Sequence, residues 1–204
     1  VGLQGLSISE RAYQQALQYS KERLQGTRRD GSRIPIIQHP DVRRMLMVMK
    51  SSIEAMRALA LTAAAEIDRA RYAQDAGEKA LHSTRVELLT PIVKGWLTEM
   101  SQELTSLGIQ VYGGMGYVEE TGAAQHYRDA RILTIYEGTT GIQALDFIGR
   151  KTLVDKGEGL LVLLQEMEQT AAELQAYPDA SVVSNFAQAL NNGSEAREWL
   201  LANA

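Results

Sequence analysis

Glu137 has the sequence surroundings expected of a proton acceptor. It lies in the segment 132–141, between apolar residues and a Gly-Thr-Thr sequence that precedes a predicted helix. Burial disfavours the charged form of a carboxylate and a following helix N-terminus favours it, so a carboxylate held between these influences can accept a proton. Gly138, the next residue, leaves room for a substrate to approach the backbone. The alternative is that Glu137 is a capping or surface carboxylate.

A cluster of glycines upstream marks a second place where a ligand can approach the backbone. Gly113, Gly114 and Gly116 lie in the sequence 110–117, and glycine inside a helix costs about 0.5–1 kcal/mol relative to alanine. Exposed backbone N–H groups in such a turn can bind a diphosphate or a carbonyl. The spacing fits neither the dinucleotide-binding Gly-x-Gly-x-x-Gly pattern nor the lysine-containing nucleotide loop.

Polar residues near the end of the first predicted helix are further candidates for ligand binding. Arg23 and Gln25 can reach a phosphate, although a solvated helix end is the simpler explanation. Arg28 and Arg29 fit a solvated loop. His39 can contact a polar ligand, although a capping or surface role is the simpler explanation.

The composition excludes several kinds of site. The 204 residues contain no cysteine, which rules out disulfides, thiolate metal sites and cysteine nucleophiles. The three histidines are far apart, so the sequence offers no local metal motif. A net charge of −4 without a basic block argues against nucleic-acid binding.

No membrane span is expected either, because no apolar run approaches the roughly 20 residues that cross a bilayer. The opening sequence has neither the basic region of a signal peptide nor an initiator Met. We therefore expect a cytoplasmic protein and a chain excised from something longer.

Helical periodicity predicts an all-α chain whose elements position these candidates. Long amphipathic helices with short connections predict an antiparallel four-helix bundle over residues 1–151, and a helical appendage over 152–204. The predicted elements are a helix from Ser7, with Glu10 in capping-box spacing, to Gly26–Thr27; a loop over 28–35; a helix with an apolar stripe from Val42 to Ala63; a helix over 78–108 that Pro91 kinks or splits; a short helix over 123–130; and a helix from Ile142 to Lys151 that follows an N-cap at Thr139 or Thr140.

Four sequence blocks together resemble the carboxy-terminal helical domain of acyl-CoA dehydrogenases. The resemblance covers residues 1 to about 151, and the opening residues and long tail are most similar to the larger subgroup that includes 3-methylmercaptopropionyl-CoA dehydrogenase. The blocks are Glu22-Arg23-x-Gln25, the sequence 110–117 (QVYGGMGY), the sequence 127–130 (YRDA) and the sequence 135–143 (IYEGTTGIQ).

The resemblance implies a flavoenzyme of three domains, of which only the helical bundle is present here. It implies that Glu137 removes the α-proton of an acyl-CoA thioester while the β-hydrogen leaves as a hydride to flavin N5. Hydrogen bonds from the backbone N–H of this glutamate and from a flavin hydroxyl would stabilise enolate character in the substrate. Gly138 would lie beside the substrate.

The resemblance also implies an FAD site at a subunit interface, and hence a homodimer or homotetramer. Arg23 and Gln25 would face the FAD diphosphate from one subunit. Gln110, Gly113 and Gly114 would face the adenosine part from a neighbour.

Further expectations follow from the family pattern. Thr139 lies in the stretch that lines the cofactor, and the implied partners are an acyl-CoA substrate and an electron-transfer acceptor. Two positions depart from the pattern: no Phe follows Gln25, and Gly141 stands where a glutamine is often found four residues after the base.

Two functions from different classes fit these observations. The chain is either the part of an FAD-dependent acyl-CoA dehydrogenase that carries the base, or a non-catalytic helical module for interaction or oligomerisation. The two overlap, because a chain without the β domain that covers the flavin is expected to bind FAD weakly or not at all and to be inactive alone.

Overall fold

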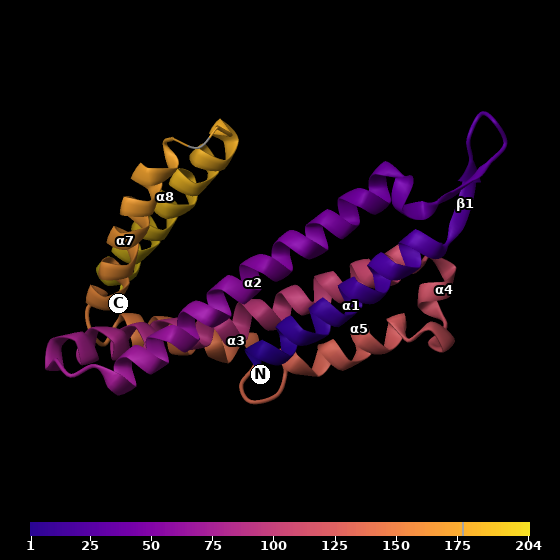
Figure 1. Cartoon of the computed structure of the whole chain (residues 1–204). Coiled ribbons are helices and arrows are strands. Elements are labelled where there is room, and N and C mark those ends of the chain that lie inside the picture. The colour runs from indigo at the N-terminus through magenta and orange to yellow at the C-terminus, as the bar shows by residue number, and fades with distance from the viewer. Residues whose placement is uncertain (177) are drawn as a thin grey trace. The chain divides into compact units, whose positions relative to one another are not determined.

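The computed structural model describes residues 1–176 and 178–204, and it confirms the predicted all-α class (Figure 1). The only strands in these residues form a short hairpin. The elements are α1 (Gly2–Glu22), β1 (Leu24–Thr27), β2 (Arg33–Pro35), the 3-10 turn η1 (Ile36–Gln38), α2 (Pro40–Tyr72), α3 (Ala76–Tyr112), α4 (Gly114–Tyr117), η2 (Glu119–Thr121), α5 (Ala123–Arg131), η3 (Ile132–Thr134), α6 (Thr140–Leu145), the π-helical η4 (Asp146–Thr152), α7 (Glu158–Leu174) and α8 (Ala180–Ala202).

The described chain divides into two compact units that are not continuous in sequence. The first unit combines residues 1–64 with 92–143, and the second combines residues 65–91 with 144–204. The division therefore runs through both long helices, α2 and α3. Each unit has its own packing.

The first unit is an antiparallel four-helix bundle. Its members are α1, the first part of α2, the second part of α3 and α5, and successive helices run in opposite directions (Figure 1). The predicted stripe of α2 supplies much of the core. The largest fully buried apolar side chains of this unit, all at most 1% exposed, are Met49, Ile53, Met56, Leu97 and Leu104. Full burial of one such side chain stabilises the fold by about 1.5–3 kcal/mol.

Small residues bring α1 unusually close to α3. A Cβ atom on Gly5 would lie 2.6 Å from the carbonyl oxygen of Leu97, so only glycine permits this approach. On α3 the facing polar side chains are buried but satisfied. The Thr98 hydroxyl donates to the Lys94 carbonyl at 2.8 Å, and the Thr105 hydroxyl donates to the Ser101 carbonyl at 2.6 Å. The backbone of α3 is therefore fixed from within and by close packing.

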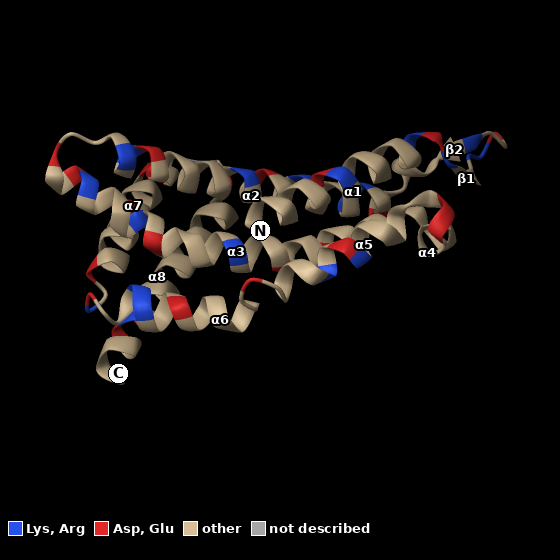
Figure 2. Cartoon of the chain, turned by 90° about the horizontal axis from the view of Figure 1, so that it is seen from below, with Lys and Arg blue, Asp and Glu red and all other residues tan. Residues whose placement is uncertain are grey.

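The limits predicted for the first helix are wrong at both ends. Helix α1 begins at Gly2 rather than Ser7, because the residues before Ser7 continue the small-residue face that packs on α3. It ends at Glu22, and the chain then forms the hairpin β1–β2 in place of a helix end and a loop. The hairpin carries basic and acidic side chains (Figure 2).

Two other boundaries also differ from the prediction. Helix α3 runs from Ala76 to Tyr112 through Pro91, so the proline does not split it. The helix expected over residues 142–151 consists of the α-helical turn α6 followed by the π-helical η4, in which the Thr152 hydroxyl donates to the Phe147 carbonyl at 2.9 Å.

In the second unit, the predicted helical tail forms the neighbouring helices α7 and α8. A buried carboxylate, Glu66, accepts hydrogen bonds from His82 at 2.6 Å and from Arg69 at 2.8 Å. Burial alone would raise the pKa of Glu66, but these bonds and the nearby charge of Arg85 outweigh it and hold the pKa below its ordinary value. Arg85 also pairs with Glu166 of α7, so this cluster ties α7 to α2 and α3 within the unit.

Across residues 1–176 and 178–204, no helix combines the length and the apolar character that a bilayer crossing requires.

We predict that Leu104→Ala lowers the free energy of unfolding by about 2–5 kcal/mol, because it leaves a cavity in the bundle core. Leu61→Ala is the matched control, since Leu61 is 63% exposed, and it should change stability by no more than about 0.5 kcal/mol. Urea denaturation of both variants measures the difference. Equal losses would mean that the core does not lie where the structure places it.

Candidate functional site

Glu137 lies in a strained turn between η3 and α6. Its backbone φ is +53°, and the following Gly138 has a φ of +91°. Left-handed backbone is natural for glycine but costs a residue with a side chain about 1–2 kcal/mol. Such strain persists only when surrounding contacts impose it, and it is concentrated at functional sites. Residues 135–139 are called the glutamate turn below.

Contacts on both sides hold the glutamate turn. At its start, the backbone N–H of Tyr136 donates to the Ile132 carbonyl at 3.1 Å. At its end, Thr139 accepts from the backbone N–H of Ile142 at 3.3 Å, as expected for the N-cap of α6. The side chain of Tyr136 also bonds to Gln4, near the start of α1.

A lysine beneath the glutamate turn makes the most unusual contact of the site. Lys94 of α3 is only 8% exposed, and its ammonium donates to the backbone carbonyl of Gly138 at 2.5 Å. Hydrogen bonds that involve a charged group contribute about 1.5–3 kcal/mol, enough to offset the strain at Glu137. Burial lowers the pKa of Lys94, while the carboxylates of Glu137 and Glu99 act in the opposite direction.

Sequence reasoning did not identify Lys94, although a signal was present. At helical spacing it shares a face with Pro91, Leu97 and Thr98, all of which are buried. A lone lysine on the buried face of a helix requires a partner, because lysine is almost never fully buried without one.

The expectation that apolar neighbours bury Glu137 is wrong for this chain. The residue is exposed, because Ile132 and Ile135 turn outward and are 50% and 47% exposed, while the intervening Leu133 and Thr134 fill the interior. The carboxylate therefore lies on the surface of the first unit, beside half-exposed apolar side chains.

The glycine cluster forms a turn in which the three glycines have different surroundings. Gly113 ends α3 with a φ of +62°, and its N–H donates to the Gln110 carbonyl at 3.0 Å. Gly116 is buried, and a Cβ atom there would overlap the backbone of Ile109. Gly114 is exposed, and a Cβ atom there would meet nothing within 4 Å. No contact among the residues that the structure describes accounts for the missing side chain of Gly114.

Arg23 and Gln25 lie where α1 gives way to the hairpin, and both are exposed. Their backbones hold the connection. The Arg23 carbonyl accepts from the Ile36 N–H at 2.9 Å, and the Gln25 carbonyl lies 2.8 Å from Nε2 of His39. His39 therefore has a structural role in the hairpin.

The structure brings Arg23 and Gln25 to the same end of the bundle as the glycine turn (Figure 1). The link is Tyr19 of α1, which stacks on Tyr112 of α3 with ring centroids 4.0 Å apart. We call this region the glycine end. It comprises Arg23, Gln25, Gln110, Gly113 and Gly114.

The glutamate turn is remote from the glycine end of the same chain. It contacts α1 at Gln4, whereas the glycine end lies beyond Tyr19. At 1.5 Å per residue, Gln4 and Arg23 are roughly 28 Å apart along α1. The predicted site residues thus form two groups, Glu137, Gly138 and Thr139 in one and the five residues of the glycine end in the other.

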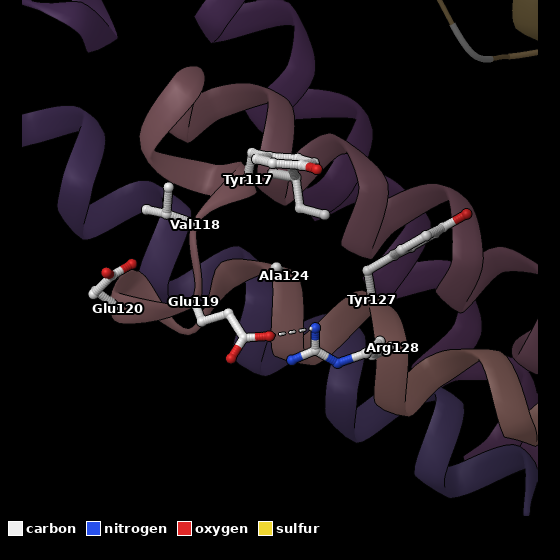
Figure 3. Close-up of a pocket in the computed structure, with 8 residues that line it drawn as sticks. Tyr117, Val118, Glu119, Glu120, Ala124, Tyr127 and Arg128 are labelled. Atoms are coloured by element: carbon white, nitrogen blue, oxygen red, sulfur yellow. Dashed lines mark hydrogen bonds and ion pairs between the residues drawn. The ribbon is translucent and has the colours of Figure 1, made fainter.

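An open groove of about 740 Å³ lies beside the glycine turn. Tyr117 and Tyr127 present aromatic rings to it, and Arg128 pairs with Glu119 at 3.0 Å on its other side (Figure 3). The groove therefore combines surfaces that suit a flat ring with charged groups. Its lining residues are Ile109, Tyr117, Val118, Glu119, Glu120, Ala124, Tyr127 and Arg128.

Comparison with known proteins gives one consistent result. Residues 1–153 match the family model for the acyl-CoA dehydrogenase C-terminal domain. The whole chain is 46% identical to 3-methylmercaptopropionyl-CoA dehydrogenase of Ruegeria pomeroyi and spans 35% of that protein. Over 81% of the chain, it is 38% identical to a butyryl-CoA dehydrogenase of Syntrophomonas wolfei, of which it spans 28%.

A solved structure agrees with these sequence matches. Butyryl-CoA dehydrogenase from Megasphaera elsdenii superimposes with a TM-score of 0.53 at 30% identity, over 73% of this chain and 34% of that one. This chain therefore spans about a third of the length of these relatives.

We predict that Gly116→Ala destabilises the protein by about 1–3 kcal/mol, because the added methyl group overlaps the backbone of Ile109. Gly114→Ala is the matched control. Its methyl group enters open space, so stability should change by no more than about 0.5 kcal/mol. Thermal denaturation compares the two variants, and a larger loss for Gly114→Ala would contradict this account of the turn.

Proposed function

The chain belongs to the acyl-CoA dehydrogenase family, and we propose that it is the C-terminal part of an FAD-dependent enzyme that forms a double bond between the α and β carbons of an acyl-CoA thioester. The observation that carries the proposal is the glutamate turn, in which strained backbone presents an exposed carboxylate. Because the chain spans about a third of its relatives, the activity belongs to a longer protein.

Glu137 is proposed to accept the α-proton of the substrate. This C–H group is a weak acid, and it becomes removable when the thioester oxygen accepts hydrogen bonds that stabilise enolate character. The backbone N–H of Glu137 is the proposed donor from this chain, and Gly138 leaves the approach open beside it. Bound FAD supplies the acceptor, at N5, for the hydride that leaves the β-carbon. The proton on Glu137 and the hydride together account for both hydrogens removed.

The glycine end has the features that an FAD site requires. Arg23 offers a positive charge and Gln25 an amide for the diphosphate, and both side chains are exposed. The open space above Gly114 suits a molecule that approaches the backbone closely, and it supports contact of Gln110, Gly113 and Gly114 with the adenosine part. The neighbouring groove with its two tyrosines extends this surface (Figure 3).

The separation of the two groups supports a functional assembly of two or four copies. The glycine end and the glutamate turn of one chain are roughly 28 Å apart along α1. We propose that an FAD held at the glycine end of one copy serves the Glu137 of another, in a homodimer or homotetramer. In this arrangement one chain supplies both the diphosphate and the adenosine contacts, in place of the two subunits that the family resemblance implied.

Thr139 is proposed to line the cofactor near the glutamate turn. Its hydroxyl accepts a hydrogen bond as the cap of α6, which fixes its orientation. FAD that had accepted the hydride would hold two electrons more, so the proposed cycle also requires an electron-transfer acceptor.

We predict that Glu137→Gln in the full-length protein slows reduction of the flavin by acyl-CoA about 10²–10⁴-fold, because the amide cannot accept the proton. The yellow flavin spectrum should remain. Stopped-flow absorbance under anaerobic conditions measures the rate with butyryl-CoA and 3-methylmercaptopropionyl-CoA.

The matched control is Glu103→Gln, which removes an exposed carboxylate from α3 and should leave the rate unchanged. Near-normal reduction by the Glu137→Gln variant would remove Glu137 from the mechanism. A full-length protein that shows no flavin spectrum and no reduction by either thioester would favour the alternative, a helical module for oligomerisation.

A further inference from the structure

We propose that Lys94 is the positioning residue for Glu137, and that it acts through the backbone carbonyl of Gly138. The inference rests on the proposed role of Glu137 as the base. Lys94 lies 43 residues before Glu137 in the chain, on α3, and its ammonium contacts the carbonyl of the Gly138–Thr139 peptide, one residue beyond the glutamate.

The contact is unusual because the buried ammonium binds backbone rather than a carboxylate. Lys94 is 8% exposed, and its Nζ lies 2.5 Å from the Gly138 oxygen. Among the described residues, no acidic side chain pairs with it within 4.0 Å. A lysine that only balanced charge would be expected to meet Glu137 or Glu99 directly.

The geometry explains why this contact controls the glutamate. Glu137 and Gly138 have successive positive φ angles of +53° and +91°. Because only one residue separates the Gly138 carbonyl from Glu137, fixing this carbonyl restricts the backbone from which the Glu137 side chain projects. Lys94 holds that carbonyl toward α3. Gln143 is the second donor to the same oxygen, but at 3.5 Å its bond is weak and cannot substitute.

The rigidity of α3 makes Lys94 a suitable anchor. One turn further along the helix, Leu97 and Thr98 are fully buried, and Gly5 of α1 packs against the Leu97 carbonyl. The Lys94 carbonyl is itself held by the Thr98 hydroxyl at 2.8 Å. The glutamate turn is therefore tied to a closely packed part of the bundle.

The test is Lys94→Met in the full-length protein, with Lys94→Arg as the conservative variant and Lys50→Met as the control at an exposed position. Loss of alignment should lower kcat for flavin reduction by butyryl-CoA about 10- to 100-fold, with KM and flavin content within about twofold of the wild-type values. Arg retains a charged donor and should recover most of the rate. Lys50→Met should match the wild type.

A double variant separates positioning from a merely structural role. If Lys94 acts through Glu137, adding Lys94→Met to Glu137→Gln lowers the residual rate by no more than about twofold. Multiplied losses would show that Lys94 acts independently and would overturn the proposal. Hydrogen exchange gives a readout without turnover: the amides of residues 136–140 should exchange faster in Lys94→Met, and those of residues 113–116 should not change.

The outcomes distinguish this inference from the proposed function. A wild-type rate in Lys94→Met together with an inactive Glu137→Gln overturns the positioning role and leaves the base in place. An active Glu137→Gln overturns the proposed function itself. If Lys94→Met does not fold, Lys94→Gln, which is neutral and one bond shorter, takes its place. A loss of at least about fivefold is then expected, and a wild-type rate overturns the proposal.

Discussion

The hydrogen bond from the Lys94 ammonium to the Gly138 carbonyl joins a rigid helix to a strained turn. On one side is α3, whose backbone is fixed by buried hydroxyls and by the close approach of α1 at Gly5. On the other side is a turn with left-handed backbone at Glu137, which is unfavourable unless neighbours impose it. The buried charge of Lys94 therefore links the turn that carries the exposed carboxylate to the packed core.

Much of the fold could be predicted from the sequence because it depends on helical periodicity. The stripe from Val42 to Ala63 becomes the core face of α2. Thr139 is a cap because its hydroxyl directly precedes the first turn of α6 and can accept a hydrogen bond from a backbone N–H there. The ends of α1 could not be predicted in this way. Gly2 and Gly5 are poor helix formers that are favoured here by contact with α3. The contacts that hold the chain after Glu22, from Ile36 to Arg23 and from His39 to Gln25, join residues more than ten positions apart.

The residues of the candidate site likewise fall into those that local sequence can indicate and those that depend on tertiary contacts. Local sequence was sufficient to select Glu137 and Gly138, since their surroundings suggest chemistry without any tertiary information. The helical pattern places Lys94 on a buried face, but its partner Gly138 lies 44 positions away, and no local pattern encodes that contact. The three glycines show that residues of the same type in one local sequence can have different structural roles. Gly113, Gly114 and Gly116 look equivalent in sequence, yet one ends a helix, one avoids a clash and one faces open space.

The exposure of Glu137 shows how the proposed chemistry is divided between this chain and its surroundings. A carboxylate in water is a weak base, and it becomes effective in catalysis when water is excluded and the substrate is oriented. Of these two requirements the bundle contributes only to orientation, and only in part, because it fixes the backbone on either side of the glutamate. The half-exposed Ile132 and Ile135 mark a surface on which an apolar cover would complete the site. On the proposed role, the chain contributes the geometry of the base, and the strength of that base is acquired only when the rest of the enzyme closes over it.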